Sequence, residues 1–447
     1  MADKINHLKK IEEKYKNKKI LIVGLGLQGG GSGLAKFFCQ VGAKVKVTDL
    51  KKKKELKSSL EILKKYPIDY VLGEHRLSDF LEADVIFKGP SVPWDIPQLK
   101  AAEKKGIPIE MEISFFAANC PAKIIGITGT RGKSTTTNLI FNLLKRNHLN
   151  VHLGGSLPEI STVNLLKKIK SEDLVVLELP SWPLSGFHRK KISPHIGVFT
   201  NFYPDHLNYY PNMDEYLYDK KAIYLYQKQN NYLIANQSLQ SLIEVDKVKS
   251  KKIYYSKLDF PGKLKFLKGE HNQENAAAAF KVAQILNLDQ KKTLEAINNF
   301  RGLPFRQEIV KIKNRVIFIN DTTSTTPIAT IKAIDTFDDK PIILLLGGKS
   351  KNLPYLDLID KLAKVKEIIL LKGSFTDEIF EILKIKYPEK ISPIYDDLTQ
   401  AVKKAYLLAK KTMQSCYLLF SPGATSFSMF NNEFHRGKEF NQIVEKL

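Results

Sequence analysis

Continuous apolar runs recur in three parts of the chain, and each leads into a glycine turn and then into apolar positions at helical spacing. Such runs lie within residues 20–23, 122–130 and 315–321. Apolar runs without polar alternation are typical of central parallel strands that helices cover on both faces. The pattern therefore predicts an α/β protein with parallel sheets.

Three domains are expected, because the pattern of strand, glycine turn and helix occurs three times along the chain. In addition, 447 residues are too many for one ordinary core. We place the boundaries near residues 108 and 302, which gives domains of 1–108, 109–302 and 303–447. No fixed-period repeat and no low-complexity linker interrupts them.

The composition is that of a soluble globular protein, with 43% hydrophobic and 26% charged residues. No apolar run reaches the roughly 18 residues of a membrane span, and the first residues lack the apolar stretch of a signal peptide. Three widely separated cysteines, Cys39, Cys120 and Cys416, suggest neither a disulfide framework nor a metal knuckle. We therefore expect a cytoplasmic protein without a membrane partner.

The net charge of +23 raises the question of a nucleic-acid partner, because basic surfaces attract polyanions. The lysines, however, are spread over the whole chain, as at 51–57, 167–170 and 249–252, and no basic block is interleaved with aromatic residues. The charge therefore favours a lysine-rich solvated surface over a nucleic-acid site. Attraction of polyanionic small substrates is the alternative.

The stretch GITGTRGKST at residues 126–135 begins in a predicted strand, Lys123–Thr128, which includes Gly126, and leads into a predicted helix. Backbone N–H groups at a helix start stabilise phosphate oxygens, while Lys133 would add a mobile cation and Ser134 an oxygen ligand for Mg²⁺. Ile127 stands where the common phosphate-binding loop has glycine, so we predict a nucleotide loop with its own geometry rather than a purely structural turn. The residues expected to contact the nucleotide are Gly129, Thr130, Gly132, Lys133, Ser134 and Thr135.

A second glycine pattern, Gly24-x-Gly26-x-x-Gly29, is followed twenty residues later by Asp49 and meets the dinucleotide-binding fingerprint. Taken alone, it is compatible with NAD, with another nucleotide-like ligand or with a tight structural turn. An NAD-dependent oxidoreductase is the rival enzyme class, although the Lys133-Ser134 loop would be superfluous there. A non-catalytic nucleotide-binding or polyanion-binding module is a third class.

Polar residues follow several predicted strands of the central part, where open α/β sheets place ligands. Glu178 ends one strand and is placed to hold a second metal ion, or is an ordinary strand-end glutamate. His206 follows another strand, although a lone histidine is more often structural. Asn275 stands just ahead of an alanine-rich helix, where its amide can read a base edge or cap the helix.

In this order, the motifs resemble those of the Mur ligase family, and most closely those of its D-glutamate-adding members. The resemblance extends from about residue 18 to about residue 440. It rests on TGTRGKST, LEL with Glu178, TN…DHL with His206, GEHNQEN, GLPFR at 302–306, IND at 319–321, LLLGGKSK at 344–351 and SPGATSF…RG at 421–437. One such motif is a weak signal, whereas eight in the right order are specific.

The resemblance implies a Rossmann-like N-terminal domain that binds the UDP part of a nucleotide sugar, a central P-loop ATPase-like domain and a Rossmann-like C-terminal domain that binds an amino acid. The implied activity is an ATP-dependent amide ligase of peptidoglycan precursor synthesis. It would add glutamate, D-glutamate by default, to UDP-N-acetylmuramoyl-L-alanine through an acyl phosphate. ATP, two Mg²⁺ ions and a carbamylated lysine are the implied cofactors, and the implied state is a monomer.

The resemblance also implies roles for individual residues. Lys133, His206 and Lys220 would be catalytic, and Lys220 would be the carbamylated lysine, because Tyr216 upstream aligns it better than its neighbour Lys221. The metal ions would be held by Ser134, Glu178, His206 and Lys220, and ATP would be reached by Asn275, Arg306 and Asp321 in addition to the loop. The substrates would contact Leu27, Gln28, Asp49, Ser156, Thr325, Lys351, Ser426 and Phe427.

The chain departs from the family's pattern mainly around the substrates. Thr323 stands where lysine is usual, Phe305 where histidine is usual and Glu433 where an aromatic residue is usual. Further departures are Ser91, Ser156, Pro180, Pro183 and Thr326. A buried carboxylate without a paired cation is costly, so L-glutamate or another acceptor stays open beside the default substrates.

Overall fold

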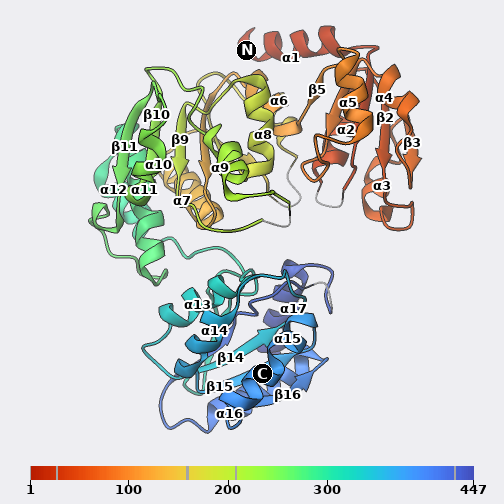
Figure 1. Ribbon diagram of the computed structural model, residues 1–447. Coiled ribbons are helices and arrows are strands. Elements are labelled where there is room, and N and C mark those ends of the chain that lie inside the picture. The colour runs from red at the N-terminus through yellow and green to blue at the C-terminus, as the bar shows by residue number, and fades with distance from the viewer. Residues whose placement is uncertain (1, 27–28, 158–160, 207–208, 427–428) are drawn as a thin grey trace. The chain divides into compact units, whose positions relative to one another are not determined.

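The computed structural model describes residues 2–26, 29–157, 161–206, 209–426 and 429–447. The predicted substrate residues Leu27, Gln28 and Phe427 lie outside this described part. The chain divides into two compact units, Met1–Lys263 with His271–Asn298 and Leu264–Glu270 with Asn299–Leu447 (Figure 1). Three sheets, two in the first unit and one in the second, confirm the predicted α/β class.

The first sheet has five parallel strands in the order β3-β2-β1-β4-β5. The strands are β1 (Lys19–Val23), β2 (Lys44–Asp49), β3 (Ile68–Leu72), β4 (Val85–Lys88) and β5 (Ile109–Glu110), and the helices are α1 (Ala2–Tyr15), α2 (Gly30–Gln40), α3 (Lys57–Leu63), α4 (Leu77–Glu82) and α5 (Pro97–Lys104). The strand order reverses between β1 and β4, and open α/β sheets bind ligands beyond the carboxyl ends of strands at such a point. The glycine turn after β1 lies at this edge.

The second sheet has six parallel strands in the order β11-β10-β9-β6-β8-β7. The strands are β6 (Lys123–Thr128), β7 (Val151–Gly155), β8 (Leu174–Glu178), β9 (Ile196–Phe199), β10 (Tyr232–Asn236) and β11 (Lys251–Tyr255). The principal helices are α6 (Glu112–Asn119), α7 (Lys133–Arg146), α8 (Ser181–Lys190), α9 (Met213–Lys221), α10 (Gln240–Glu244), α11 (Glu270–Ile285) and α12 (Gln290–Asn298). β6 pairs with β8 and β9, so the segments that follow these three strands meet at one edge.

The third sheet has the order β12-β13-β17-β14-β15-β16. The strands are β12 (Glu308–Lys313), β13 (Val316–Asn320), β14 (Ile342–Gly347), β15 (Glu367–Leu371), β16 (Ile391–Tyr395) and β17 (Cys416–Phe420), and the helices are α13 (Pro327–Thr336), α14 (Leu356–Lys361), α15 (Ser374–Lys386), α16 (Leu398–Lys410) and α17 (Glu433–Lys446). Every residue of β14 is buried, as the continuous apolar run predicts. The edge strand β12 is antiparallel to β13, and Ile309 and Ile312 on it are exposed.

An aromatic cluster joins the first two sheets into one compact unit. The ring of Phe115 from α6 lies 5.7 Å from that of Phe38 in α2 and 5.3 Å from that of Phe87 in β4, centroid to centroid. Edge-on and tilted contacts of this kind stabilise buried aromatic groups.

The domain boundaries near 108 and 302 stay a prediction. Among the described residues, the helices include none with the length and apolar character of a membrane span.

Candidate functional site

The glycine-rich loop connects the strand β6 to helix α7, as predicted. Gly129 and Gly132 have φ values of 144° and 80°, in the region that favours glycine. A Cβ at Gly129 would lie 1.9 Å from Thr200 Oγ1, and one at Gly132 would lie 2.4 Å from Asn275 Oδ1. Both positions therefore require glycine, and the loop ends at the first N–H groups of α7, which are suited to phosphate oxygens.

Gly129→Ala is expected to destabilise the protein by more than about 1 kcal/mol and to weaken ADP binding by roughly tenfold or more, because the new methyl group would collide with Thr200. Thermal unfolding and calorimetric titration with ADP measure the two effects. Gly106→Ala is the matched control, since Gly106 has a φ of 79° but a Cβ there meets nothing within 4 Å. Equal ADP affinities of the two variants would contradict this steric role.

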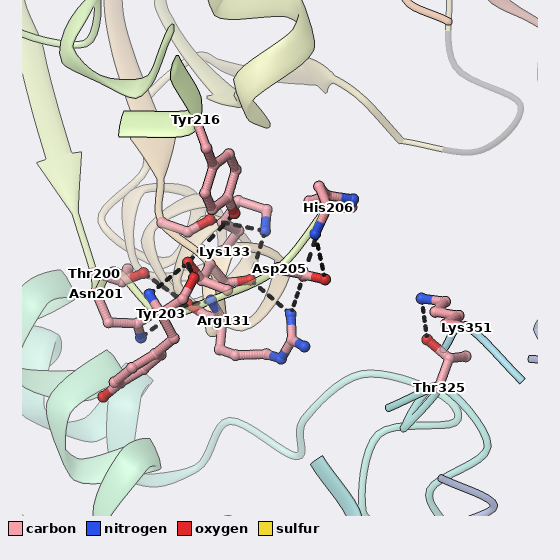
Figure 2. Close-up of polar contacts among 12 residues, drawn as sticks. Arg131, Lys133, Thr200, Asn201, Tyr203, Asp205, His206, Tyr216, Thr325 and Lys351 are labelled. Carbon is pink, nitrogen blue, oxygen red and sulfur yellow. Dashed lines mark hydrogen bonds and ion pairs between the residues drawn. The ribbon is translucent and has the colours of Figure 1, made fainter. Parts of the chain in front are cut away.

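The side chain of Lys133, the first residue of α7, lies across the loop. Its Nζ donates to Gly129 O and to Thr130 O, each at 3.0 Å (Figure 2). Ser134 and Thr135 follow in the first helical turn and are half-buried. The ammonium therefore adds a full positive charge to the positive end of the helix dipole.

The segment after β9 wraps around this loop (Figure 2). Asn201 Oδ1 accepts from Arg131 N at 2.8 Å, and Thr200 Oγ1 donates to Arg131 O at 2.6 Å. Tyr203 N donates to Thr130 Oγ1 at 3.0 Å. The TN motif, Thr200-Asn201, thus shapes the glycine-rich loop.

A chain of charged groups leads from the loop to His206. Arg131 Nη1 donates to Asp205 Oδ2 at 2.7 Å, and His206 Nε2 lies 3.5 Å from the same oxygen. The His206 ring packs 5.0 Å from Trp182 and 5.8 Å from Tyr216, centroid to centroid. Sequence reasoning missed Arg131 and Asp205, although both belong to motifs that it quoted.

Lys220 reaches the same loop from helix α9. It is 1% exposed, its Nζ donates to Gly129 O at 2.9 Å and lies 4.6 Å from the centre of the Tyr216 ring. Burial lowers the pKa of Lys220 well below its usual range, the charge of Lys133 lowers it further, and Asp205 opposes both. Lys221 instead pairs with Asp246, so the structure brings Lys220, and not its neighbour, to the loop.

Glu178 ends β8, next to the loop's own strand β6. The side chain is 6% exposed, and Oε2 is buried with no hydrogen-bond partner among the described residues. An unpaired buried carboxylate oxygen fits a hard cation such as Mg²⁺. In the described part of the chain, no group of three or more His, Cys, Asp or Glu residues could hold a metal by itself. A metal at Glu178 would therefore need other donors.

Asn275 supports the loop from inside helix α11. Its Oδ1 accepts from Thr136 Oγ1 at 3.1 Å, and its Nδ2 donates to Asn272 Oδ1 at 3.2 Å. The side chain is 5% exposed and stands within the helix rather than at its cap. The capping alternative is therefore wrong, while contact with adenine stays a prediction.

The two predicted substrate residues that the structure describes in the first unit, Asp49 and Ser156, make hydrogen bonds that shape backbone turns. Asp49 Oδ2 accepts from Leu25 N at 2.8 Å and from Gly26 N at 3.2 Å, and Oδ1 accepts from Lys51 N at 2.9 Å. Asp49 thus holds the glycine turn after β1 in place. Ser156 is exposed, and its N–H donates to Glu178 O at 3.0 Å. Contact of either residue with a substrate stays a prediction.

In the second unit, Asp321 lies at the carboxyl end of β13. It is 3% exposed and accepts from Ser324 Oγ at 2.6 Å and Ser421 Oγ at 2.8 Å. Burial raises the pKa of Asp321 to about 6, against the effect of these hydrogen bonds. Arg306 is exposed and lowers that pKa through its charge.

The residues predicted to bind the amino acid substrate follow the neighbouring strands β13, β14 and β17 of the second unit. Lys351 Nζ donates to Thr325 Oγ1 at 3.3 Å (Figure 2). Ser426 is 2% exposed, and its Oγ has no partner among the described residues. Thr323, which stands in place of a lysine, donates its hydroxyl to Phe305 O at 2.8 Å.

The fold and this chemistry define the class of the protein, an ATP-dependent ligase built from three α/β domains. Residues 18–110 match the family model described as "Mur ligase MurD-like, N-terminal domain", and residues 127–266 match "Mur ligase middle domain". The chain belongs to the Mur ligase family. Members of this family use ATP and Mg²⁺ and act on small molecules.

Curated relatives match over nearly the whole chain. The UDP-N-acetylmuramoylalanine--D-glutamate ligase of Roseiflexus sp. (strain RS-1) is 35% identical over 96% of this chain and 99% of its own. The enzyme of the same name from Borreliella burgdorferi (strain ZS7) is 35% identical over 97% of this chain and 99% of its own.

Solved structures share the fold at lower identity. UDP-N-acetylmuramate-alanine ligase MurC from Thermotoga maritima superposes with a TM-score of 0.60 at 19% identity, over 96% of this chain and 99% of that one. MurF ligase from Thermotoga maritima, in complex with ADP, has a TM-score of 0.58 at 17% identity, over 97% of both chains. The three-domain α/β fold expected from the sequence is confirmed.

Proposed function

We propose that the protein ligates D-glutamate to UDP-N-acetylmuramoyl-L-alanine with ATP, in the synthesis of peptidoglycan precursors. The observation that carries the proposal is the convergence of Lys133 and the buried Lys220 on Gly129 O, after the strand β6 whose neighbour β8 ends at Glu178 with its orphaned oxygen. This arrangement is suited to phosphoryl transfer. The substrates are those in the names of the near-full-length relatives.

The proposed division of labour follows the predicted domains 1–108, 109–302 and 303–447. The first would bind the UDP part beside Asp49, the second would bind ATP through the loop and Asn275, and the third would contribute Arg306 and Asp321 to ATP and bind the amino acid. The proposal includes a monomer that acts in the cytoplasm without a nucleic-acid partner.

The first step would activate the acceptor. An oxygen of its terminal carboxylate attacks the γ-phosphorus of ATP, the bond from this phosphorus to the bridging oxygen breaks, and ADP leaves. Lys133 and the first N–H groups of α7 would stabilise the negative charge on the transferred phosphoryl group.

The second step would form the amide. The neutral amine of glutamate attacks the carbonyl carbon of the acyl phosphate, a C–N bond forms, the C–O bond to phosphate breaks, and the amine proton passes to solvent. Thr325, Lys351 and Ser426 would orient the amino acid for this attack.

The metal ions would be held by Ser134, Glu178, His206 and a carbamate on Lys220. Bound Mg²⁺ would neutralise charge on the phosphoryl oxygens. The carbamate would form when the neutral Lys220 amine attacks the carbon of CO₂ and releases a proton. Its formation is favoured at this position, because the lowered pKa leaves more of the amine neutral than at an exposed lysine.

Phosphate release tests the proposed function. Purified protein with ATP, Mg²⁺ and UDP-N-acetylmuramoyl-L-alanine is expected to release phosphate when D-glutamate is added. Release with L-glutamate alone would instead support the alternative left open by Thr323, Phe305 and Glu433. Release with neither enantiomer would contradict the substrate assignment.

A further inference from the structure

Arg436 in the first turn of α17 is the largest fully buried side chain among the described residues, with 1% exposure. Nε donates to Thr322 Oγ1 at 2.7 Å, and Nη2 donates to Thr322 O at 2.8 Å and Ala424 O at 3.1 Å. All of these acceptors are neutral, and burial lowers the pKa of Arg436 to about 10. Glu433, earlier on the same helix, opposes this shift through its charge. Burying a cation whose hydrogen-bond acceptors are all neutral is costly, which suggests that this arginine has a function.

Three loops meet at this guanidinium group. Thr322 belongs to the loop after β13, and Ala424 belongs to the loop after β17. The third loop follows β14, where a Cβ at Gly348 would lie 3.5 Å from Arg436 Nη1. Because β13, β17 and β14 are neighbours in the sheet, the loops after all three lie around one buried side chain, which donates to the first two and lies next to the third.

The same three loops carry the residues proposed to bind the amino acid. Thr325 follows Thr322 by three residues, Lys351 follows Gly348 by three and Ser426 follows Ala424 by two. The β14 and β17 loops are also bonded to each other, since Lys349 N donates to Thr425 O at 2.9 Å and Thr425 N donates to Lys349 O at 3.0 Å. Each residue proposed to bind the amino acid therefore lies in a loop next to the guanidinium group of Arg436.

We propose that Arg436 is a positioning residue of the amino-acid pocket. Its buried positive charge holds these three loops in place. The proposal rests on the proposed function. The charge favours an incoming amino acid with an acidic side chain, which brings two carboxylates, and it would add to the charge of the exposed Lys351. Arg436 itself contacts the loops rather than the amino acid.

Kinetics of the full-length protein test this role. Arg436→Met, which removes the charge at similar volume, is expected to raise the KM for glutamate by roughly 30-fold and those for ATP and the UDP substrate by less than about threefold. Arg436→Lys keeps the charge and should recover part of the loss. Thr322→Val removes one acceptor and should raise the glutamate KM by about fivefold. Arg315→Met is the matched control, because Arg315 precedes β13 at the opposite end of the strand and should leave all three constants unchanged.

Amide hydrogen exchange gives a readout that needs no substrate. In Arg436→Met, the amides of 322–326, 348–351 and 424–426 are expected to exchange faster than in the wild type, while those of β15 keep their protection. Unchanged exchange in these loops would overturn the proposal, as would a folded variant with a wild-type KM for glutamate. An equal rise in all three KM values would also overturn it, because it would show a general loss of structure. An inactive wild type would contradict the proposed function, and hydrogen exchange would still decide the role of Arg436.

Discussion

Replacing Lys133 by methionine is expected to lower kcat by roughly 10²- to 10³-fold, with little change in thermal stability. Methionine keeps most of the side-chain volume but removes the only full charge that the first turn of α7 places over the loop. The lost interaction is with charge that develops on the transferred phosphoryl group, so kcat should fall more than the KM for ATP rises.

Steady-state phosphate release at saturating substrates measures the effect. Lys123→Met is the matched control, because Lys123 is an exposed residue at the other end of the strand that leads into the loop. It should retain the wild-type kcat. If Lys133→Met turned over within threefold of the wild type, the proposed role of Lys133 would be wrong.

Lys220→Ala is expected to lose activity by roughly 10²-fold or more and to regain part of it with formate or acetate. As an ammonium, Lys220 would stand beside the charge of Lys133 in a buried site, which is unfavourable. A carbamate reverses the sign of its charge and so turns this repulsion into attraction. In the alanine variant, a small carboxylate ion can enter the space of the missing side chain and supply the same oxygens.

The measurement is kcat as a function of added carboxylate, with chloride at equal ionic strength as the reference. Lys221→Ala is the matched control, since Lys221 is the next residue of the helix but pairs with Asp246. It should be active without rescue. Full activity of Lys220→Ala in the absence of carboxylates would exclude the carbamate.

The sequence predicted the parts of the site that are local in the chain. Gly126 was assigned to the strand, and the structure places it in β6, where a Cβ would lie 2.5 Å from Pro194. The loop that follows was recognisable because its glycines, its lysine and the helix start are consecutive residues. The edge strand β12 escaped the prediction of parallel strands, because charged residues interrupt its apolar residues and leave no continuous apolar run.

Contacts between distant residues could not be predicted in the same way. Arg131 and Asp205 are 74 residues apart, and no spacing rule links them. The guanidinium of Arg436 lies 114 residues from its partner Thr322, and arginine is among the residues least often buried. Only the folded structure shows that Arg436 is buried, because the three loops around it are distant from one another in the sequence.

The sequence by itself determined the α/β class, the nucleotide loop and the family, because strand patterns and loop motifs depend on residues close together in the chain. Only the tertiary structure gave the physical reason why Lys220, which the family resemblance favoured over Lys221, faces the loop. Successive residues on a helix point about 100° apart, so the packing of α9 against the loop makes that choice. Only the tertiary structure, likewise, brought one buried charge to three strand ends, because sheet order rather than chain order makes them neighbours.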